Sequence, residues 1–254
     1  KMASSSSSEN DSILSTTSTD IHVAVDLGYD WPKEKKPAKE RQGGVVKQLS
    51  NFAEQFDRWK FNYPPVLCCG KGVAEIQDRI NHLGPLVRCD NIDIFDMSGF
   101  SLIYLSPDAN EYLDISKGFP IKENGSGEPI VFIVGGLIDR KVKRGRSQIR
   151  AESKNIPSYQ LPLEEYNGEP MNIDTILAIL YYWKAFDSKY TEKIQPDSPS
   201  DSDENSDSLS LSHLSINKSL SHEVEDRSES FRAARHCAIY EHKKRHPNQG
   251  AHTL

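Results

Sequence analysis

This 254-residue sequence has few cysteines, no long apolar run and only a modest net charge. Its four cysteines show no disulfide-framework spacing, which is typical of a reducing compartment, so we expect the nucleus or the cytoplasm. No run approaches the ~20 apolar residues that span a bilayer, and no membrane partner is expected. No signal or transit pattern is legible at the start of the sequence.

Motifs of the common nucleotide-binding enzymes are also missing. No G-x-G-x-x-G follows the first expected strand, which leaves a dinucleotide-binding enzyme as a weak alternative. Gly70-Lys71-Gly72 lacks the frame of a phosphate-binding P-loop. Cys68 and Cys69 end an apolar run, so we interpret them as strand packing and expect no metal site.

The net charge of −6 is unevenly distributed. Lys and Arg counted against Asp and Glu give −2 for residues 1–20, −1 for 21–190 and −3 for 191–254. Because the central region is nearly neutral, a local basic run stands out in it. Local potential, more than net charge, steers an encounter with RNA.

Composition predicts one globular domain between two tails. Residues 1–20 form a Ser-rich tail, and 191–254 an acidic Ser-rich tail with a short basic C-terminal segment. Both have too few apolar side chains to offset the entropy lost on ordering, so we expect both tails to be disordered. Residues 21–190 remain as the domain and are numerous enough to bury a sizeable core.

Strand and helix patterns alternate within residues 21–190. The expected strands are 21–26, 64–69, 100–105, 131–139 and 159–163. The expected helices are 45–59, 72–83, 106–113, 147–154 and 172–186. This alternation predicts an α/β domain with a mainly parallel sheet flanked by helices.

One segment, 131–150, combines a strand pattern with glycines, a carboxylate and many cations. Gly135 and Gly136 end the apolar run and allow the backbone to approach a ligand closely. Asp139 follows at the carboxyl end of the strand, where open α/β sheets bind ligands. A carboxylate beside a cluster of cations, which attract phosphates, indicates acid–base chemistry on a nucleic acid. The cations are Arg140, Lys141, Lys143, Arg144, Arg146 and Arg150.

Four blocks occur in an order that is typical of one known family. They are IYLSPDA (103–109), VFIVGGLIDRKVKRG (131–145), IPSYQLPLEEY (156–166) and MNIDTILAILYYW (171–183). Together they resemble the tRNA (guanine-9-N1)-methyltransferase family, a branch of the SPOUT superfamily. The resemblance implies a SPOUT-like, trefoil-knotted α/β fold and a monomer.

The same resemblance implies a cofactor, a base and an RNA-binding surface. The cofactor is S-adenosyl-L-methionine, and Asp139 is the candidate general base that removes the N1 proton of guanine. The basic residues implied to grip tRNA phosphates are Arg140, Lys141, Lys143, Arg144 and Arg146. The residues implied to hold the cofactor are Leu105, Ser106, Gly135, Ser147, Leu161, Pro170, Met171 and Ile173.

The predicted function is therefore methylation of N1 of the purine at position nine of tRNA. Guanine is the expected base, and adenine remains open. The main alternative is a noncatalytic tRNA-binding paralogue that acts as a subunit of a tRNA-processing complex.

Overall fold

The computed structural model describes residues 21–61, 65–90, 93–120, 127–137, 145–163, 171–194 and 212–245. Two compact units divide the chain. The first comprises Lys1–Tyr112 and Ile121–Ile173, and the second comprises Leu113–Pro120 and Asp174–Leu254. The helix expected at 172–186 therefore groups with the C-terminal residues, although we had placed it inside a single 21–190 domain.

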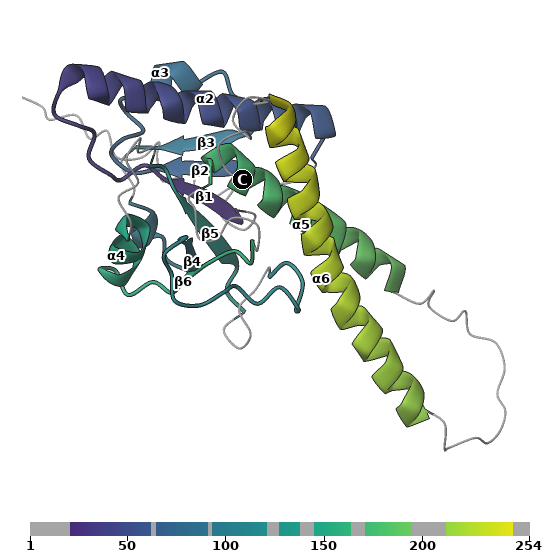
Figure 1. Cartoon of the computed structure of the whole chain (residues 1–254). Coiled ribbons are helices and arrows are strands. Elements are labelled where there is room, and N and C mark those ends of the chain that lie inside the picture. Colours follow the sequence, from purple (N-terminus) through teal and green to yellow (C-terminus); the bar gives the residue numbers. More distant parts are fainter. Residues whose placement is uncertain are drawn as a thin grey trace, which may run out of the picture. The chain divides into compact units, whose positions relative to one another are not determined.

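A six-stranded sheet forms the centre of the first unit (Figure 1). All strand pairs are parallel, and the order across the sheet is β3-β2-β1-β5-β4-β6. The strands are β1 (Val23–Asp26), β2 (Val66–Cys69), β3 (Leu86–Cys89), β4 (Ser101–Leu105), β5 (Ile130–Gly135) and β6 (Ser158–Tyr159). The α/β class with a parallel sheet is thereby confirmed, and the trefoil knot stays a prediction.

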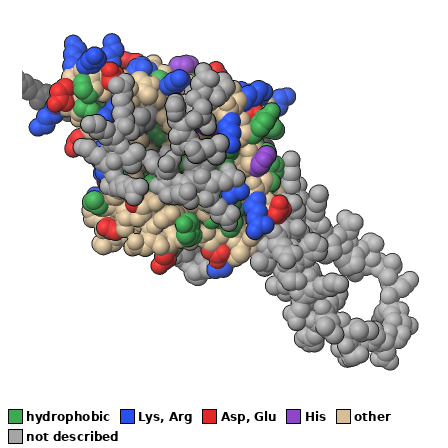
Figure 2. All heavy atoms as spheres, in the orientation of Figure 1, with side chains coloured by type: hydrophobic (Ala, Val, Ile, Leu, Met, Phe, Trp, Pro, Cys, Tyr) green, Lys and Arg blue, Asp and Glu red, His purple; other side chains and the backbone are tan. Residues whose placement is uncertain are grey.

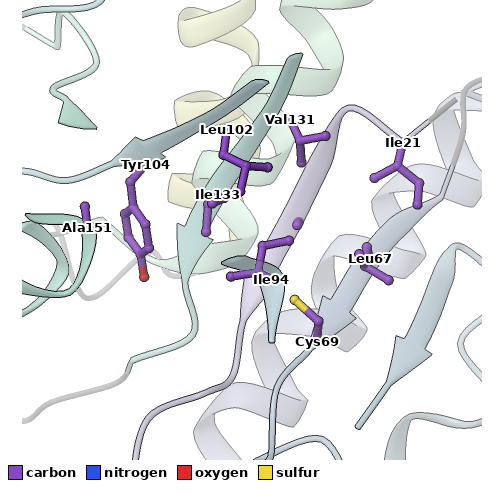
Figure 3. Close-up of a cluster of buried hydrophobic side chains, with 10 residues drawn as sticks. Ile21, Leu67, Cys69, Ile94, Leu102, Tyr104, Val131, Ile133 and Ala151 are labelled. Atoms are coloured by element: carbon purple, nitrogen blue, oxygen red, sulfur yellow. The ribbon is translucent and has the colours of Figure 1, made fainter. Parts of the chain in front are cut away.

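The strands form because apolar runs are buried on both faces of a parallel sheet. All four residues of β1 and of β2 are buried, including Cys68 and Cys69. Their packing role is confirmed. Figure 3 shows core side chains from neighbouring strands, with Tyr104 of β4 beside Ala151 at one end of the cluster.

The helices of the first unit are α2 (Lys35–Trp59), α3 (Gln77–Ile80) and α4 (Arg146–Glu152), and a 3-10 turn, η1, spans Ile94–Asp96. Val45, Leu49 and Phe52 form the buried stripe of α2. α3 contacts α2, and α4 contacts β4 and β6. The short helix α4 thus lies at the end of the sheet that carries the candidate site.

Three helix expectations differ from the structure. α2 begins at Lys35, ten residues before the expected 45, because its first turns are polar and have no apolar stripe. The 72–83 helix contracts to Gln77–Ile80. Residues 106–113 are not helical. The main-chain N–H of Gln160 donates a hydrogen bond to the carbonyl oxygen of Glu111 at 2.7 Å, which ties this segment to the strand region of Gln160.

The second unit is built on α5 (Ile173–Ile194) and α6 (Ser212–Arg245). Trp183 is fully buried between two rings, with its centroid 5.1 Å from Phe119 and 5.0 Å from Phe231. Tyr181 and Tyr182 are also buried. These aromatic residues of α5 are core residues.

The expected disorder of 191–254 is wrong for the part that forms α6. Phe231, Ala234 and Ala238 recur at helical spacing and are buried, so this helix gains the packing that an isolated one lacks. Two further contacts tie α6 to the start of α5: Arg245 pairs with Asp174 at 3.2 Å, and His242 lies 3.1 Å from Thr175. Residues 1–20, 195–211 and 246–254 lie outside the described residues.

Candidate functional site

The strand order reverses direction between β1 and β5. From β1 the chain moves outward through β2 to β3, whereas β5, β4 and β6 lie on the other side. In open parallel sheets, ligands bind beyond the carboxyl ends of the strands at such a switch point. The residues at this position are Asp26 to Tyr29 after β1, and Gly135 to Leu137 at and after the end of β5.

A buried carboxylate, Asp26, organises this edge of the sheet. Arg150 of α4 donates to both of its oxygens, from Nε to Oδ2 at 2.5 Å and from Nη2 to Oδ1 at 3.0 Å. The Tyr104 hydroxyl donates to Oδ2 at 3.0 Å, and the Gly28 amide to Oδ1 at 2.8 Å. Asp26 is fully buried, and these four bonds supply the partners that a buried charge requires.

Two tyrosines extend the network from Asp26. The hydroxyls of Tyr29 and Tyr104 lie 2.7 Å apart. Burial raises the pKa of Tyr104 well above its usual value, and the charge of Asp26 raises it further. Burial also raises the pKa of Tyr29. Both phenols therefore keep their protons at neutral pH and act as hydrogen-bonding groups, not as bases.

Cations on and just after α4 lie over two aromatic rings from other segments, Tyr29 and Phe95. The Arg146 and Arg150 guanidinium carbons lie 5.4 Å and 5.0 Å from the centroid of Tyr29. Arg150 also lies 5.0 Å from the ring of Phe95, and the Lys154 ammonium 5.4 Å from the same ring. Arg146 and Arg150, four residues apart, lie on one face of α4, and Lys154 follows two residues after the helix ends. The rings and Asp26 fix Arg150 between them.

The glycines at this edge are required by close packing within the chain. A Cβ on Gly136 would come within 2.8 Å of the carbonyl oxygen of Asp26. A Cβ on Gly28 would overlap the guanidinium of Arg150. The space above Gly135 is less crowded, because a Cβ there would meet three hydroxyl oxygens at 3.2–3.4 Å; they belong to Ser147, Tyr104 and Tyr29.

Five of the predicted cofactor residues come together along the β5, β4 and β6 ends. Leu105 pairs with Val134 in β5 and with Tyr159 in β6. Gly135 faces Ser147 of α4, as its Cβ distance shows. The Ser106 amide donates to the Tyr159 carbonyl at 3.0 Å, two residues before Leu161.

The remaining three predicted cofactor residues, Pro170, Met171 and Ile173, come from the sequence that leads into α5. Met171 and Ile173 adjoin the start of α5, where Gln48 of α2 accepts from the Ile173 amide at 2.7 Å. Gln48 also donates to Asn172 at 3.3 Å. Pro170 lies outside the described residues.

The residues predicted for catalysis and most of those predicted for RNA binding fall outside the described part of the chain. They are Asp139, Arg140, Lys141, Lys143 and Arg144. Arg146 is described, and it lies over Tyr29 at the start of α4. Arg150 serves as the partner of Asp26. A second group of exposed cations covers the beginning of α2, as Figure 2 shows; it comprises Lys33, Lys35, Lys36 and Lys39.

The geometry fits a ligand held by main chain and hydroxyls at the β5 and β4 ends. Gly135 leaves its α-carbon facing three hydroxyls, and the apolar side chain of Leu105 belongs to the neighbouring strand β4, paired with Val134. A methyl donor such as S-adenosyl-L-methionine, with a polar ribose and an apolar adenine face, suits this mixture of groups. The described network itself contributes binding and rigidity, because the carboxylate of Asp26 is fully committed to its donors.

Sequence reasoning missed the Asp26 network. The nearest signals were an aspartate that ends the first expected strand and a glycine two residues later. Asp26 and Arg150 are 124 residues apart, and nothing local to either residue indicates the other. Tyr29 and Tyr104 had no motif to mark them.

Two general findings concern the whole described region. No described helix combines the length and apolar character that crossing a bilayer requires. Within the same residues, no group of three or more His, Cys, Asp or Glu side chains is placed to hold a metal ion.

Comparisons with known proteins find likeness only among solved structures. No family model and no curated protein matches the sequence. The chain is similar to spTrm10 in complex with SAH, at 16% identity over 69% of this chain and 95% of that one, with a TM-score of 0.45. It is similar to dual-specific Trm10 from Thermococcus kodakaraensis, at 19% identity over 66% and 93%, with a TM-score of 0.46. It is also similar to the yeast arginine methyltransferase SFM1 with SAH, at 12% identity over 68% and 74%, with a TM-score of 0.40.

Proposed function

We propose that this protein is an S-adenosyl-L-methionine-dependent tRNA methyltransferase that modifies N1 of the purine at position nine, with guanine as the expected base. The observation that carries the proposal is the convergence of three sequence blocks at one edge of the sheet. The block 103–109 ends β4, the block 131–145 ends β5, and the block 156–166 contains β6. Parallel strands bring their carboxyl ends to the same edge, where such sheets bind ligands.

The residues of the chain have separate roles in this proposal. The backbone around Leu105 and Gly135 holds the cofactor, with Ser147 and Leu161 beside it. When bound, the cofactor supplies a methyl group activated by its sulfonium. With guanine as the base, Asp139 accepts the proton from N1, since that nitrogen must lose it to become a nucleophile.

Positioning supplies the rest of the proposed rate enhancement. The bonds from Arg150 to Asp26 join α4 to β1 and keep Gly28 and Tyr29 in place. Arg146, at the start of α4, and the cations of 140–144 contact tRNA phosphates. A rigid frame of this kind holds two reactants in line, which lowers the barrier by removing motion that would otherwise be lost at reaction.

The test is methyl transfer from labelled S-adenosyl-L-methionine to an unmodified tRNA transcript. An N1-methylated purine blocks Watson–Crick pairing, so primer extension should stop at position nine. Transcripts with guanine or adenine at that position separate the two bases. Asp139→Asn should retain cofactor binding and lose transfer; transfer at the wild-type rate would contradict the role of Asp139.

One observation favours a noncatalytic tRNA-binding protein as the second candidate. In the described network, Asp26 is buried and saturated with donors, and the two tyrosines keep their protons. The described side chains of this network therefore offer no proton acceptor, and catalysis depends on Asp139. Cofactor and tRNA binding without any transfer would establish this second candidate.

A further inference from the structure

The C-terminal half of α6 carries its basic side chains on the side opposite its buried one. Phe231, Ala234 and Ala238 are at most 1% exposed. At ~100° per residue, five exposed side chains of this half of the helix fall within an arc of about 120°. We name this surface the α6 basic face; it consists of Arg232, His236, Tyr240, Lys243 and Lys244.

The charge of this face is positive and little compensated. Two described carboxylates lie near it: Glu241 is 8% exposed and on the buried side, whereas Glu229 is exposed and falls within the arc of the face. Arg232 pairs with Glu229 at 3.2 Å, but both side chains are more than half exposed. Such a surface pair is weak, so the face keeps its attraction for anions.

Tyr240 adds a flat apolar surface among these cations. It is 61% exposed, which makes it one of the most exposed large side chains in the described structure. His236 stands four residues before it, and Lys243 and Lys244 stand three and four residues after it. Residues at these spacings are neighbours on a helix. The face therefore suits a ligand that offers phosphates and a planar ring together.

The α6 basic face is held on a fixed support. Phe231 packs edge-on against Trp183, and Arg245 pairs with the buried carboxylate of Asp174 at 3.2 Å. His242 lies 3.1 Å from Thr175. A surface fixed before binding loses less conformational entropy when the ligand arrives.

We propose that the α6 basic face binds single-stranded nucleic acid, with its cations on phosphates and Tyr240 stacked on a base. Stacking on an aromatic side chain within a basic groove or face is how proteins hold single strands. Tyr240 is the only large exposed apolar side chain in the described part of α6, too little for insertion into a membrane surface. An acidic peptide would satisfy the charges but leave the ring unused.

The choice of RNA over DNA rests on the proposed function. The α6 basic face itself contains none of the residues to which that function assigns a role. Arg232 and Lys244 are twelve residues apart, which is about 18 Å along a helix. A strand of about 12 nucleotides is therefore long enough to cover the face and lies within the usual site sizes.

The experiment measures binding of a labelled RNA of about 12 nucleotides to the full chain by fluorescence anisotropy at several salt concentrations. Tyr240→Ala should weaken binding about tenfold, which lies within the loss of about fivefold to 150-fold expected for one stacked base. Lys243→Gln with Lys244→Gln should reduce the salt slope by about 1.4, the value for two phosphate contacts on a single strand. The matched control, Lys39→Gln with Lys47→Gln on α2, removes the same charge and should bind as the wild type does.

Three results would overturn the assignment. Equal weakening by the α2 control would show that binding follows total charge. Unchanged binding by Tyr240→Ala would remove the stacked base. If the RNA does not bind but phosphatidylserine vesicles do, and if vesicle binding needs Lys243 and Lys244, then the partner is a membrane surface. A labelled DNA of the same sequence tests the choice of RNA.

Calorimetry with SAH on the same proteins separates this inference from the proposed function. All variants should bind SAH equally, because none of the changed residues lies at the β4 and β5 ends. Loss of SAH binding in the wild type with intact RNA binding would overturn the proposed function alone. Normal SAH binding with no effect of the α6 variants would overturn the α6 assignment alone.

Discussion

Asp26 and Arg150 are the residues whose pairing most directly fixes the candidate site. Asp26 is fully buried, and the Arg150 side chain is about one-fifth exposed and held between two rings. Burial of this carboxylate is tolerable only with its donors in place, so the two residues act as one unit. Their bond also connects β1 to α4 across a long stretch of sequence.

Removing Arg150 should destabilise the first unit strongly. Arg150→Ala leaves the carboxylate of Asp26 buried with two fewer donors, and we expect the free energy of unfolding to fall by about 3–5 kcal/mol. Urea denaturation followed by tryptophan fluorescence measures this loss. Arg146→Ala is the control, because it removes a cation 5.4 Å from the Tyr29 ring and leaves the donors to Asp26 in place, so it should cost about 1 kcal/mol or less. Similar losses for both variants would contradict the compensating role of Arg150.

Asp187 in α5 gives the second unit a pH dependence of known sign. Burial raises the pKa of this carboxyl above its ordinary 3.8, although it accepts the Phe119 amide at 3.1 Å. The folded state therefore binds the proton more tightly than the unfolded state. The resulting stabilisation is complete below the ordinary pKa and disappears as the pH rises through the raised value.

Asp187→Asn should remove this contribution while it keeps an acceptor for Phe119. The difference in unfolding free energy, wild type minus variant, should fall as the pH rises from about 3 to about 6. Urea titrations at each pH give the difference, and other carboxyls cancel between the two proteins. A difference that increases with pH would reverse the sign and contradict a raised pKa.

At the scale of elements, the turn after β5 depends on how closely it passes β1. The Gly136 amide donates to the Asp26 carbonyl at 2.8 Å, and a Cβ on Gly136 would meet that same oxygen at 2.8 Å. Backbone cannot yield there as a flexible side chain can. Gly135 is different, because its nearest neighbours are hydroxyls that can rotate or shift.

We therefore expect Gly136→Ala to be more damaging than Gly135→Ala. Crowding of a packed interior costs about 1–3 kcal/mol, and Gly136→Ala should reach the upper end of that range. Gly135→Ala should cost less and should disturb ligand binding more than stability. Urea midpoints compare the two proteins directly, and the opposite order of stabilities would show that the β1–β5 approach is not the tight one.

The elements also show which parts of the structure the sequence could predict. An observed strand overlaps each of the five expected ranges, because runs such as 131–134 are apolar and β-branched, a local signal. The range 159–163 overlaps β6 only at Tyr159. β3 was not predicted, since its pattern is mixed with half-buried residues. The helix α6 was missed because its first half is rich in serine and charge, while the packing that supports it comes from α5.

The candidate site divides in the same way. Gly135, Ser147, Leu105 and Ser106 were implied by motif blocks, and the structure brings them to one edge of the sheet. Asp26 and the cation–aromatic contacts of α4 were not predicted, because they depend on contacts between segments far apart in sequence. Tertiary partners of this kind leave no periodic trace.

At the scale of the whole molecule, ligand binding should appear as added stability. A ligand that binds only the folded protein stabilises it by RT ln(1 + [L]/Kd), which is about 2.7 kcal/mol at a hundredfold excess over Kd. SAH at that excess should raise the unfolding free energy of the first unit by this amount. Adenosine alone serves as a control for the missing amino-acid part, and the absence of any shift with SAH would remove the cofactor from the proposal.

The sheet borders bear on how copies of the protein can associate. β6 is two residues long, and the neighbouring Tyr112 already bridges to Gln160 beside it. β3, at the other border, has four residues. A foreign strand would find little free ladder at β6, and short borders of this kind discourage edge-to-edge aggregation. Self-association through β6 is thus disfavoured, and β3 is the longer of the two border strands.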